Sequence, residues 1–329
     1  MKLVPIALCG LIAAAFLSTA QAQDCGLKRF AALDMLGDPR DSVVVAVTMD
    51  GTDRKMLIDT GGIYPGISQK AVAELKLKQT GLAPEMEIYT AGGKKITDYA
   101  TVPELQIGSN KVRNLRLMVQ PEGMLTEQLD GILSPDFLSQ FDLDFDFAAK
   151  KLNLFSPDHC EGKVVYWAPA YAVIPFKIDA GHIEVDVTLD GKDVKAVVDT
   201  GATRSAISSS ATKKLFDFDP ATETAQKASA SDSDLTNETD HRFQQLTIGG
   251  VTVSNPAFRV YEDKAEKAYW QQHTDMIDRD PLYGREGLVM APITLGLNVL
   301  SKLHVYIAFK EHKIYVTPAD AAWPAKASQ

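Results

Sequence analysis

Short segments of alternating apolar and polar residues run through the first half of the chain, and this period predicts half-buried β-strands. A valine-rich strand is predicted at 42–49, followed by the tight-turn pair Asp50-Gly51 and an apolar strand at 56–58. Residues 68–77 instead have helical spacing, with Ser68 in the N-cap position. Further elements are predicted as a hairpin at 85–102 and strands at 105–107, 115–119 and 141–155.

The strictest alternation lies at the start of the segment 141–155. Phenylalanine and leucine alternate there with Asp142, Asp144 and Asp146. This pattern predicts one buried face and one solvated face that carries the three aspartates. A calcium loop is the alternative interpretation, but the segment lacks the glycine and the closing glutamate of such a loop. We therefore expect a solvated face.

The second half of the chain repeats this order of elements. It contains a polar segment at 221–240, which we expect to be mobile and which stands where the first half has its Gly92-Gly93 hairpin. It also contains an insertion at about 262–291, whose aromatic residues either pack on the lobe or form a cleft wall or partner surface. Strands are predicted at 183–189, 194–198, 242–248, 257–261, 303–307 and 313–316, with a helix at 208–215.

An internal duplication is marked most clearly by the tripeptide Asp-Thr-Gly, which occurs at residues 59–61 and again at 199–201. In each copy the aspartate comes eight residues after the glycine of an Asp-Gly turn, and an Ile-Ser pair follows at equal spacing. A repeated motif in repeated surroundings indicates a duplicated structural unit. Each unit contributes one carboxylate, Asp59 or Asp199.

The chemistry of this tripeptide follows from its three residue types. Glycine permits a sharp turn and a close approach of two backbones. The threonine hydroxyl can bond into the opposite loop, and the aspartate places a carboxylate at the top of the turn. If the halves pack about a pseudo-two-fold axis, the two carboxylates meet and share a proton. Such a pair can activate a water and protonate a carbonyl oxygen without a metal or a covalent nucleophile.

These motifs resemble the retropepsin-like aspartyl proteases, of the duplicated and exported bacterial type. The family places an apolar–apolar–Gly segment beside each Asp-Thr-Gly, and here residues 132–134 and 294–296 correspond to it, of which the second matches. Ser134 departs from that pattern, because a glycine is expected there. Gly62 also departs, since the family has alanine or serine at this place, as Ala202 does. The resemblance covers about residues 40–318.

The resemblance implies an all-β fold with two pseudo-symmetric acid-protease lobes, at 23–157 and 171–329, joined by a linker at 158–170. It implies an aspartic endopeptidase whose catalytic dyad is Asp59 and Asp199 and which needs no cofactor. The substrate would be a peptide or protein, and the joined halves imply a monomer. Supporting residues would be Thr60, Gly61, Thr200 and Gly201, and a flap over the cleft would contain Tyr89, Thr90, Gly92 and Gly93.

A second function remains open at this stage, a peptide-binding module on the same fold that has lost turnover. The departures at Gly62 and Ser134 and the unlike second flap region are its only indications. Both aspartates are present, which favours the enzyme.

Composition excludes other classes of function. The chain has 329 residues and a formal net charge of −9, without a basic run longer than two residues, so nucleic acid is not an expected partner. The six histidines show no paired metal-ligand spacing, so no zinc site is expected.

The N-terminus predicts export. Lys2, an apolar run at 6–17 and the small residues Ala20-Gln21-Ala22 form the pattern of a signal peptide at 1–22. An uncleaved anchor is the alternative, but the apolar run is short for a membrane span. We therefore expect a periplasmic or secreted protein with no membrane span.

Two cysteines remain after that segment, and they flank the first repeat. An exported compartment is oxidising, so a disulfide between Cys25 and Cys160 is expected to close the first lobe. The alternative is two unrelated thiols, because sequence alone does not fix connectivity.

Overall fold

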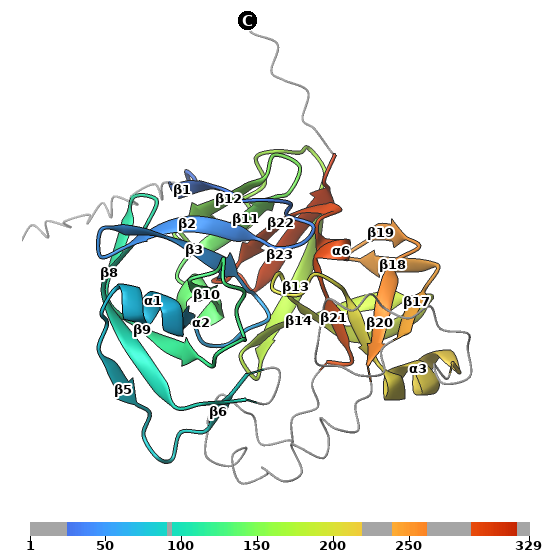
Figure 1. Cartoon of the computed structure of the whole chain (residues 1–329). Helices are drawn as coiled ribbons and strands as arrows, with labels where there is room; N and C mark the ends of the chain where they lie inside the picture. The colour runs from blue at the N-terminus through green and yellow to red at the C-terminus, as the bar shows by residue number, and fades with distance from the viewer. Residues whose placement is uncertain (1–24, 91–93, 219–238, 262–290, 321–329) are drawn as a thin grey trace, which may run out of the picture.

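The computed structural model describes residues 25–90, 94–218, 239–261 and 291–320 of the chain. Within these residues the protein is mainly β, with two lobes that repeat one architecture (Figure 1). This confirms the predicted fold class. The predictions for the signal peptide, Gly92, Gly93, nearly all of the polar segment at 221–240 and the insertion lie outside the described residues.

Lobe one is built on a seven-stranded sheet of order β2-β3-β10-β4-β9-β8-β5. The predicted Asp-Gly turn joins its first two strands, and Asp50 and Gly51 have φ angles of 47° and 78°, as a tight hairpin turn requires. Ser68 is the N-cap of the helix and accepts a hydrogen bond from Ala71 N at 3.1 Å, which confirms its predicted position. The elements are β2 (Val44–Met49), β3 (Thr52–Ile58), β4 (Gly66–Ser68), α1 (Gln69–Glu74), β5 (Gln79–Gly81), β6 (Ile88–Tyr89), β7 (Lys95–Ile96), β8 (Asp98–Ile107), β9 (Asn110–Gln120), β10 (Gly131–Leu133) and α2 (Pro135–Leu138).

The strands expected at 105–107 and 115–119 are parts of one longer hairpin, β8–β9. Most residues in the first half of β9 are exposed or half-buried, so this stretch lacks the buried apolar positions that reveal a strand in the sequence. The expected hairpin around Gly92-Gly93 is present in its flanks, where β6 and β7 pair antiparallel.

Lobe two repeats these features. Its β15 runs parallel to β21, with Val198 opposite Leu295, as β3 runs parallel to β10 with Ile58 opposite Leu133. The predicted helix is present as α3, with Ser208 as its N-cap. The elements are β14 (His182–Leu189), β15 (Lys192–Val198), β16 (Ala206–Ser208), α3 (Ser209–Phe216), β17 (Thr239–Arg242), β18 (Gln245–Ile248), β19 (Val251–Ser254), β20 (Ala257–Tyr261), β21 (Ile293–Leu295) and α6 (Leu297–Leu300).

The two lobes share one sheet, because β11 of the first half pairs antiparallel with β22 of the second, with Phe145 opposite Val305. The strand order across this junction is β1-β12-β11-β22-β23-β13 (Figure 1). β13 was not predicted from the sequence, since most of its residues are exposed or half-buried and it contains Pro175. The strands are β1 (Arg29–Asp34), β11 (Asp142–Asp146), β12 (Lys151–Phe155), β13 (Ala172–Asp179), β22 (Leu303–Ala308) and β23 (Lys313–Pro318).

The expected solvated face of β11 is wrong, because Asp142 and Asp144 are both fully buried. Asp142 Oδ2 lies 2.5 Å from His159 Nε2, and Asp144 Oδ1 lies 2.5 Å from His304 Nε2. Burial raises the pKa of Asp142, and the hydrogen bond with His159 offsets part of that rise.

The segment that follows β12 explains the error, because it folds back over this face. Trp167 stacks on the His304 ring with centroids 4.0 Å apart, and Tyr166 donates a hydrogen bond to Asp144. Alternation along one strand identifies two faces but does not show what covers the second. The aspartates therefore form a buried polar layer where the lobes join.

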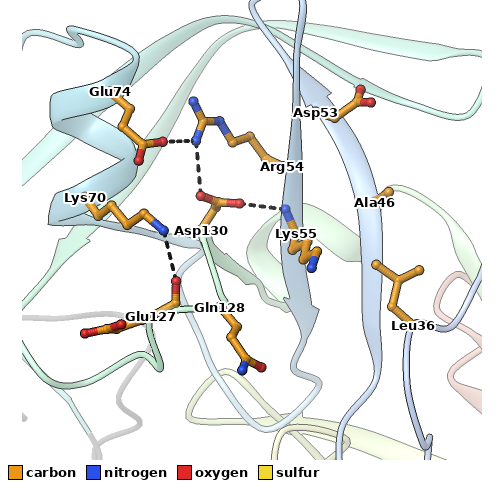
Figure 2. Close-up of a pocket in the computed structure, with 10 residues that line it drawn as sticks. All are labelled: Leu36, Ala46, Asp53, Arg54, Lys55, Lys70, Glu74, Glu127, Gln128 and Asp130. Atoms are coloured by element: carbon orange, nitrogen blue, oxygen red, sulfur yellow. Dashed lines mark hydrogen bonds and ion pairs between the residues drawn. The ribbon is translucent and has the colours of Figure 1, made fainter.

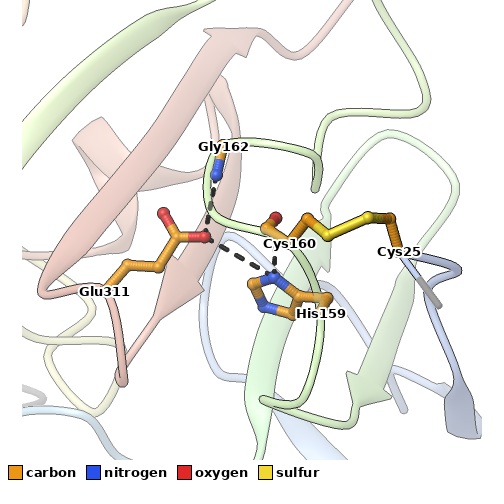
Figure 3. The surroundings of a disulfide bond; sticks show 5 residues. All are labelled: Cys25, His159, Cys160, Gly162 and Glu311. Carbon is orange, nitrogen blue, oxygen red and sulfur yellow. Dashed lines mark hydrogen bonds and ion pairs between the residues drawn. A yellow bond between two sulfur atoms is a disulfide. The ribbon is translucent and has the colours of Figure 1, made fainter. Parts of the chain in front are cut away.

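The expected disulfide between Cys25 and Cys160 is present, with Cα atoms 4.8 Å apart (Figure 3). It ties the segment before β1 to the segment after β12. The neighbouring Gly162 N donates to Glu311 of the β22–β23 turn at 3.0 Å. The disulfide thus fixes the start of a segment that also contacts the second half.

The buried layer predicts a large loss of stability when one partner is removed. Asp144→Ala leaves His304 without its carboxylate and is expected to lower the free energy of unfolding by about 3 kcal/mol or more. Asp158→Ala removes a carboxylate that is 82% exposed and is expected to cost under about 0.5 kcal/mol. Urea unfolding of both variants measures the difference, and equal losses would contradict the structural role of this layer.

Candidate active site

The two aspartates occupy equivalent positions at the ends of equivalent strands. Asp59 follows β3 and its N–H donates to Leu133 O at 3.0 Å, while Asp199 follows β15 and donates to Leu295 O at 3.0 Å. In each lobe the strand that leads to the aspartate is therefore fixed against the parallel strand β10 or β21. The apolar–apolar segments noted in the sequence are these parallel strands.

The two Asp-Thr-Gly loops are joined by four reciprocal hydrogen bonds. Thr60 Oγ1 donates to Val198 O and Thr200 Oγ1 donates to Ile58 O, both at 2.7 Å. Each hydroxyl also accepts from the other threonine's N–H, at 3.0 and 3.2 Å. Both threonines are buried, so these bonds are shielded from water.

The glycines let each carboxyl lie against the opposite loop. A Cβ atom on Gly61 would stand 2.1 Å from Asp199 Cγ, and one on Gly201 would stand 2.5 Å from Asp59 Cγ. Any other residue at these two places would therefore displace the opposite carboxyl. The structure thus brings Asp59, Thr60, Gly61, Asp199, Thr200 and Gly201 together at the junction of the lobes.

Backbone N–H groups orient both carboxyls. Asp59 Oδ1 accepts from Gly61 N at 3.0 Å and Gly62 N at 2.8 Å. Asp199 Oδ1 accepts from Gly201 N at 2.8 Å and Ala202 N at 3.1 Å. Each carboxyl is held by one oxygen, which leaves the other oxygen for further contacts.

The electrostatics of the pair favour a shared proton. Burial raises the pKa of Asp199 well above the usual carboxyl range, and the negative charge of Asp59 raises it further. Burial also raises the pKa of Asp59, and hydrogen bonds from Gly62 N, Asp199 and Gly61 N offset part of that rise. The two carboxyls therefore favour holding one proton between them, and they titrate together.

Sequence reasoning missed His182, the first residue of β14. Burial lowers the pKa of His182, and a hydrogen bond with the Gly61 backbone and the negative charge of Asp59 offset part of that fall. Its Nδ1 is buried and has no hydrogen-bond partner among the described residues. The offset of 140 residues between the repeats makes Ser42 the equivalent residue of the first half. Because that residue is not a histidine, the repeat gives no signal for the contact of His182 with Gly61.

The predicted flap residues Tyr89 and Thr90 lie at the end of β6. Thr90 N donates to Lys94 O at 2.9 Å, and Lys94 N donates to Thr90 Oγ1 at 3.1 Å. These two hydrogen bonds join the two arms of the hairpin at Thr90 and Lys94. Its role as a cover for the cleft stays a prediction.

A hollow of about 360 Å³ lies on lobe one, and none of the residues that line it belongs to the aspartate pair (Figure 2). Arg54 reaches across it to Glu74 of α1 and to Asp130, whose Oδ2 also accepts from Lys55 N at 2.9 Å. These charges are paired with one another. The network fixes the start of β10 against β3, and so supports the Asp59 loop from behind.

Within the residues that the structure describes, no group of three or more His, Cys, Asp or Glu side chains is placed to hold a metal ion. The same residues include no helix that is long and apolar enough to cross a membrane.

Comparison with known proteins identifies the family. A sequence profile described as aspartyl protease matches residues 45–137 and 185–284, once in each half and over more than half of the chain. The chain therefore belongs to the aspartyl protease family. A comparison with curated proteins finds no match.

The fold is also similar to that of the aspartic proteinase from Irpex lacteus. Its crystal structure matches with a TM-score of 0.53 and 14% sequence identity, over 88% of this chain and 97% of that one. At this identity the likeness concerns the fold, and it extends over both lobes.

The threonine bonds predict a matched pair of stability effects. Thr60→Val keeps the shape of the side chain but removes a buried donor and acceptor, and is expected to lower the free energy of unfolding by about 2 kcal/mol. Thr203→Val removes a hydroxyl on an exposed residue that donates to Asp41 O at 2.7 Å, and is expected to cost under about 1 kcal/mol. Chemical denaturation compares the two, and the reverse order would count against the loop junction.

Proposed function

We propose that this protein is an aspartic endopeptidase that hydrolyses peptide bonds with a water held between Asp59 and Asp199. The observation that carries this proposal is the mutual placement of the two carboxyls over the glycines of the opposite loops. Family membership supports the same reaction class. Two carboxyls that share one proton supply a base and an acid in a single site.

The pair holds one proton before the attack, and in this proposal that proton is on Asp199. In the attack, Asp59 accepts a proton from the water as its oxygen bonds to the carbonyl carbon, and Asp199 gives its proton to the carbonyl oxygen. The product of this step is a tetrahedral diol. When the carbon–nitrogen bond breaks, a proton passes from Asp59 to the amine, and a diol hydroxyl returns a proton to Asp199. The pair ends with the one proton that it held at the start.

The supporting residues act on geometry. Thr60 and Thr200 fix the distance between the loops, and the N–H groups after each aspartate orient its carboxyl. The substrate would be an extended peptide between the lobes, with Tyr89 and Thr90 on the covering hairpin. Because one chain supplies both carboxyls, the site needs no second copy of the protein.

The site of action that we propose is an oxidising compartment outside the cytoplasm, periplasmic or secreted. The disulfide between Cys25 and Cys160 supports this. The N-terminal pattern at 1–22 supports export by the same reasoning.

The proposal predicts that both aspartates are needed for turnover. Asp59→Asn and Asp199→Asn are each expected to lower kcat/KM for peptide cleavage by about a thousandfold or more, because the pair loses its shared proton. Asp186→Asn changes a carboxylate that is 88% exposed and is expected to retain full activity. The assay incubates the purified protein with a diverse peptide library from acid to neutral pH, with and without a statine-type inhibitor.

Turnover that persists in either active-site variant would reject the mechanism. Peptide binding by the wild type without any cleavage would instead support the alternative, a binding module on the same fold.

The raised pKa of Asp199 predicts a stability effect with a definite sign. A carboxyl whose pKa is higher in the folded than in the unfolded state favours folding while it is protonated, and this contribution is lost as the pH rises toward and past the folded-state pKa. Asp199→Asn removes the ionisable group and is expected to raise the free energy of unfolding relative to wild type at pH 8. Near pH 3 the two proteins should differ little from this cause. Urea unfolding at both pH values tests it, and a destabilised variant at pH 8 would contradict the assignment.

A further inference from the structure

The loop of Asp59 differs from that of Asp199 at two facing positions. Lobe two has Ala202 after its Asp-Thr-Gly and Gly296 after β21, whereas lobe one has Gly62 and Ser134. In lobe two the residue after Asp-Thr-Gly has a Cβ atom and the residue after the parallel strand has none, whereas lobe one has the reverse. Ser134 also adds a hydroxyl. Each replacement alone departs from the family pattern, but together they fill one space.

The geometry shows why the two residues depend on each other. A Cβ atom on Gly62 would stand 2.6 Å from Ser134 Oγ and 2.8 Å from Asp59 Oδ2. Gly62 therefore leaves the room that the serine hydroxyl occupies. The same two distances place the hydroxyl and Asp59 Oδ2 no more than about 5.4 Å apart.

Ser134 has an unsatisfied donor at this place. The residue is 1% exposed, and its Oγ has no hydrogen-bond partner among the described residues. A buried hydroxyl without a partner is unfavourable, and charged acceptors form the stronger hydrogen bonds. Asp59 Oδ1 already accepts from two N–H groups, so Oδ2 is the acceptor that remains nearby.

In the part of lobe two that the structure describes, the position equivalent to Ser134 is Gly296, which has no hydroxyl. Gly296 has no side chain, and a Cβ atom there would stand 2.5 Å from the Arg204 backbone. Ser205 Oγ, a hydroxyl of the Asp199 loop, already donates to Asn298 Oδ1 at 2.8 Å and accepts from Gly296 N at 2.9 Å. A serine hydroxyl is therefore free to act on Asp59 and not on Asp199.

We propose that Ser134 Oγ donates a hydrogen bond to Asp59 Oδ2 and makes Asp59 the ionised member of the pair. Ser134 acts through Asp59 and is a positioning residue. The hydrogen bond requires rotation about the Cα–Cβ bond of Ser134, which moves the hydroxyl between staggered positions. The inference deepens the proposed function, because the hydrogen bond selects which carboxyl acts as the base.

The effect of Ser134 on the ionisation of Asp59 can be separated from the effects of other charged groups nearby. Among the described residues, the titratable groups that act on it are Asp199, which shares its proton, and His182, whose positive form also favours the carboxylate. Neither residue is altered when Ser134 is changed, so an effect of Ser134 on the titration of the pair is separable from theirs.

The first test is the pH profile of peptide cleavage by Ser134→Ala, which keeps the Cβ atom and removes only the hydroxyl. Loss of a hydrogen bond to the carboxylate is expected to move the acid limb of kcat/KM upward by about one pH unit, a loss of about tenfold on that limb. The basic limb should move less. Ser139→Ala, an exposed serine at the end of α2, is the matched control and should leave both limbs in place.

A purely structural serine would change thermal stability without moving the acid limb, and that result would overturn the proposal.

The second test needs no turnover. Carbon-13 NMR of labelled aspartate carboxyls follows the titration of the pair in wild type and Ser134→Ala, and the lower apparent pKa should rise in the variant. If wild type cleaves no peptide but this shift is seen, the endopeptidase proposal fails and the role of Ser134 stands. If wild type cleaves peptides and no shift is seen, the role of Ser134 fails alone.

Ser134→Gly also removes the hydroxyl and places at this position the residue that lobe two has at Gly296. It should bring the acid limb to the position found for Ser134→Ala, and it decides the question if Ser134→Ala does not fold. An acid limb that stays at the wild-type position in folded Ser134→Gly would refute the hydrogen bond.

Discussion

The reciprocal hydrogen bonds between Thr60 and Thr200 are the constraint on which the rest of the site depends. They join two loops that are 140 residues apart in the chain, and each threonine stands between the aspartate and the glycine of its own loop. Each carboxyl lies over the opposite glycine only because the loops are held at this separation. The cost of burying two acidic groups together is tolerated because the loops cannot part without breaking buried bonds.

Much of the site could be predicted because the duplicated motifs depend on residues that are close together in the sequence. The Asp-Gly turns, the strand ends before Asp59 and Asp199 and the N-cap at Ser68 depend on neighbours in the chain, so equal spacing in the two halves gives equal structure. The Cys25–Cys160 pairing could be predicted from the position of both residues at the edges of one repeat. The role of the aspartates in catalysis stays a prediction, as do the lobe boundaries.

The errors concern contacts between segments that are distant in sequence. Asp142 and Asp144 read as a solvated face because nothing in their own strand reveals that Tyr166 and Trp167 return to cover them. His182 looked like one of six scattered histidines, because its contact with Gly61 lies across the lobe junction. Gly62 and Ser134 are 72 residues apart in the sequence, and only the distances between them show that the two departures are coupled.

The sheet that underlies both lobes has a consequence for the order of assembly. β11 is translated before residue 147, but its partner β22 begins at Leu303, and β1 at the outer edge waits for β12 more than a hundred residues later. Pairings of such long range form slowly, since much of the chain must be ordered before they close. A growing or truncated polypeptide therefore lacks part of the sheet that the two lobes share. The arrangement around Asp59 and Asp199 would be complete only after β22 and β23 have been synthesised and paired.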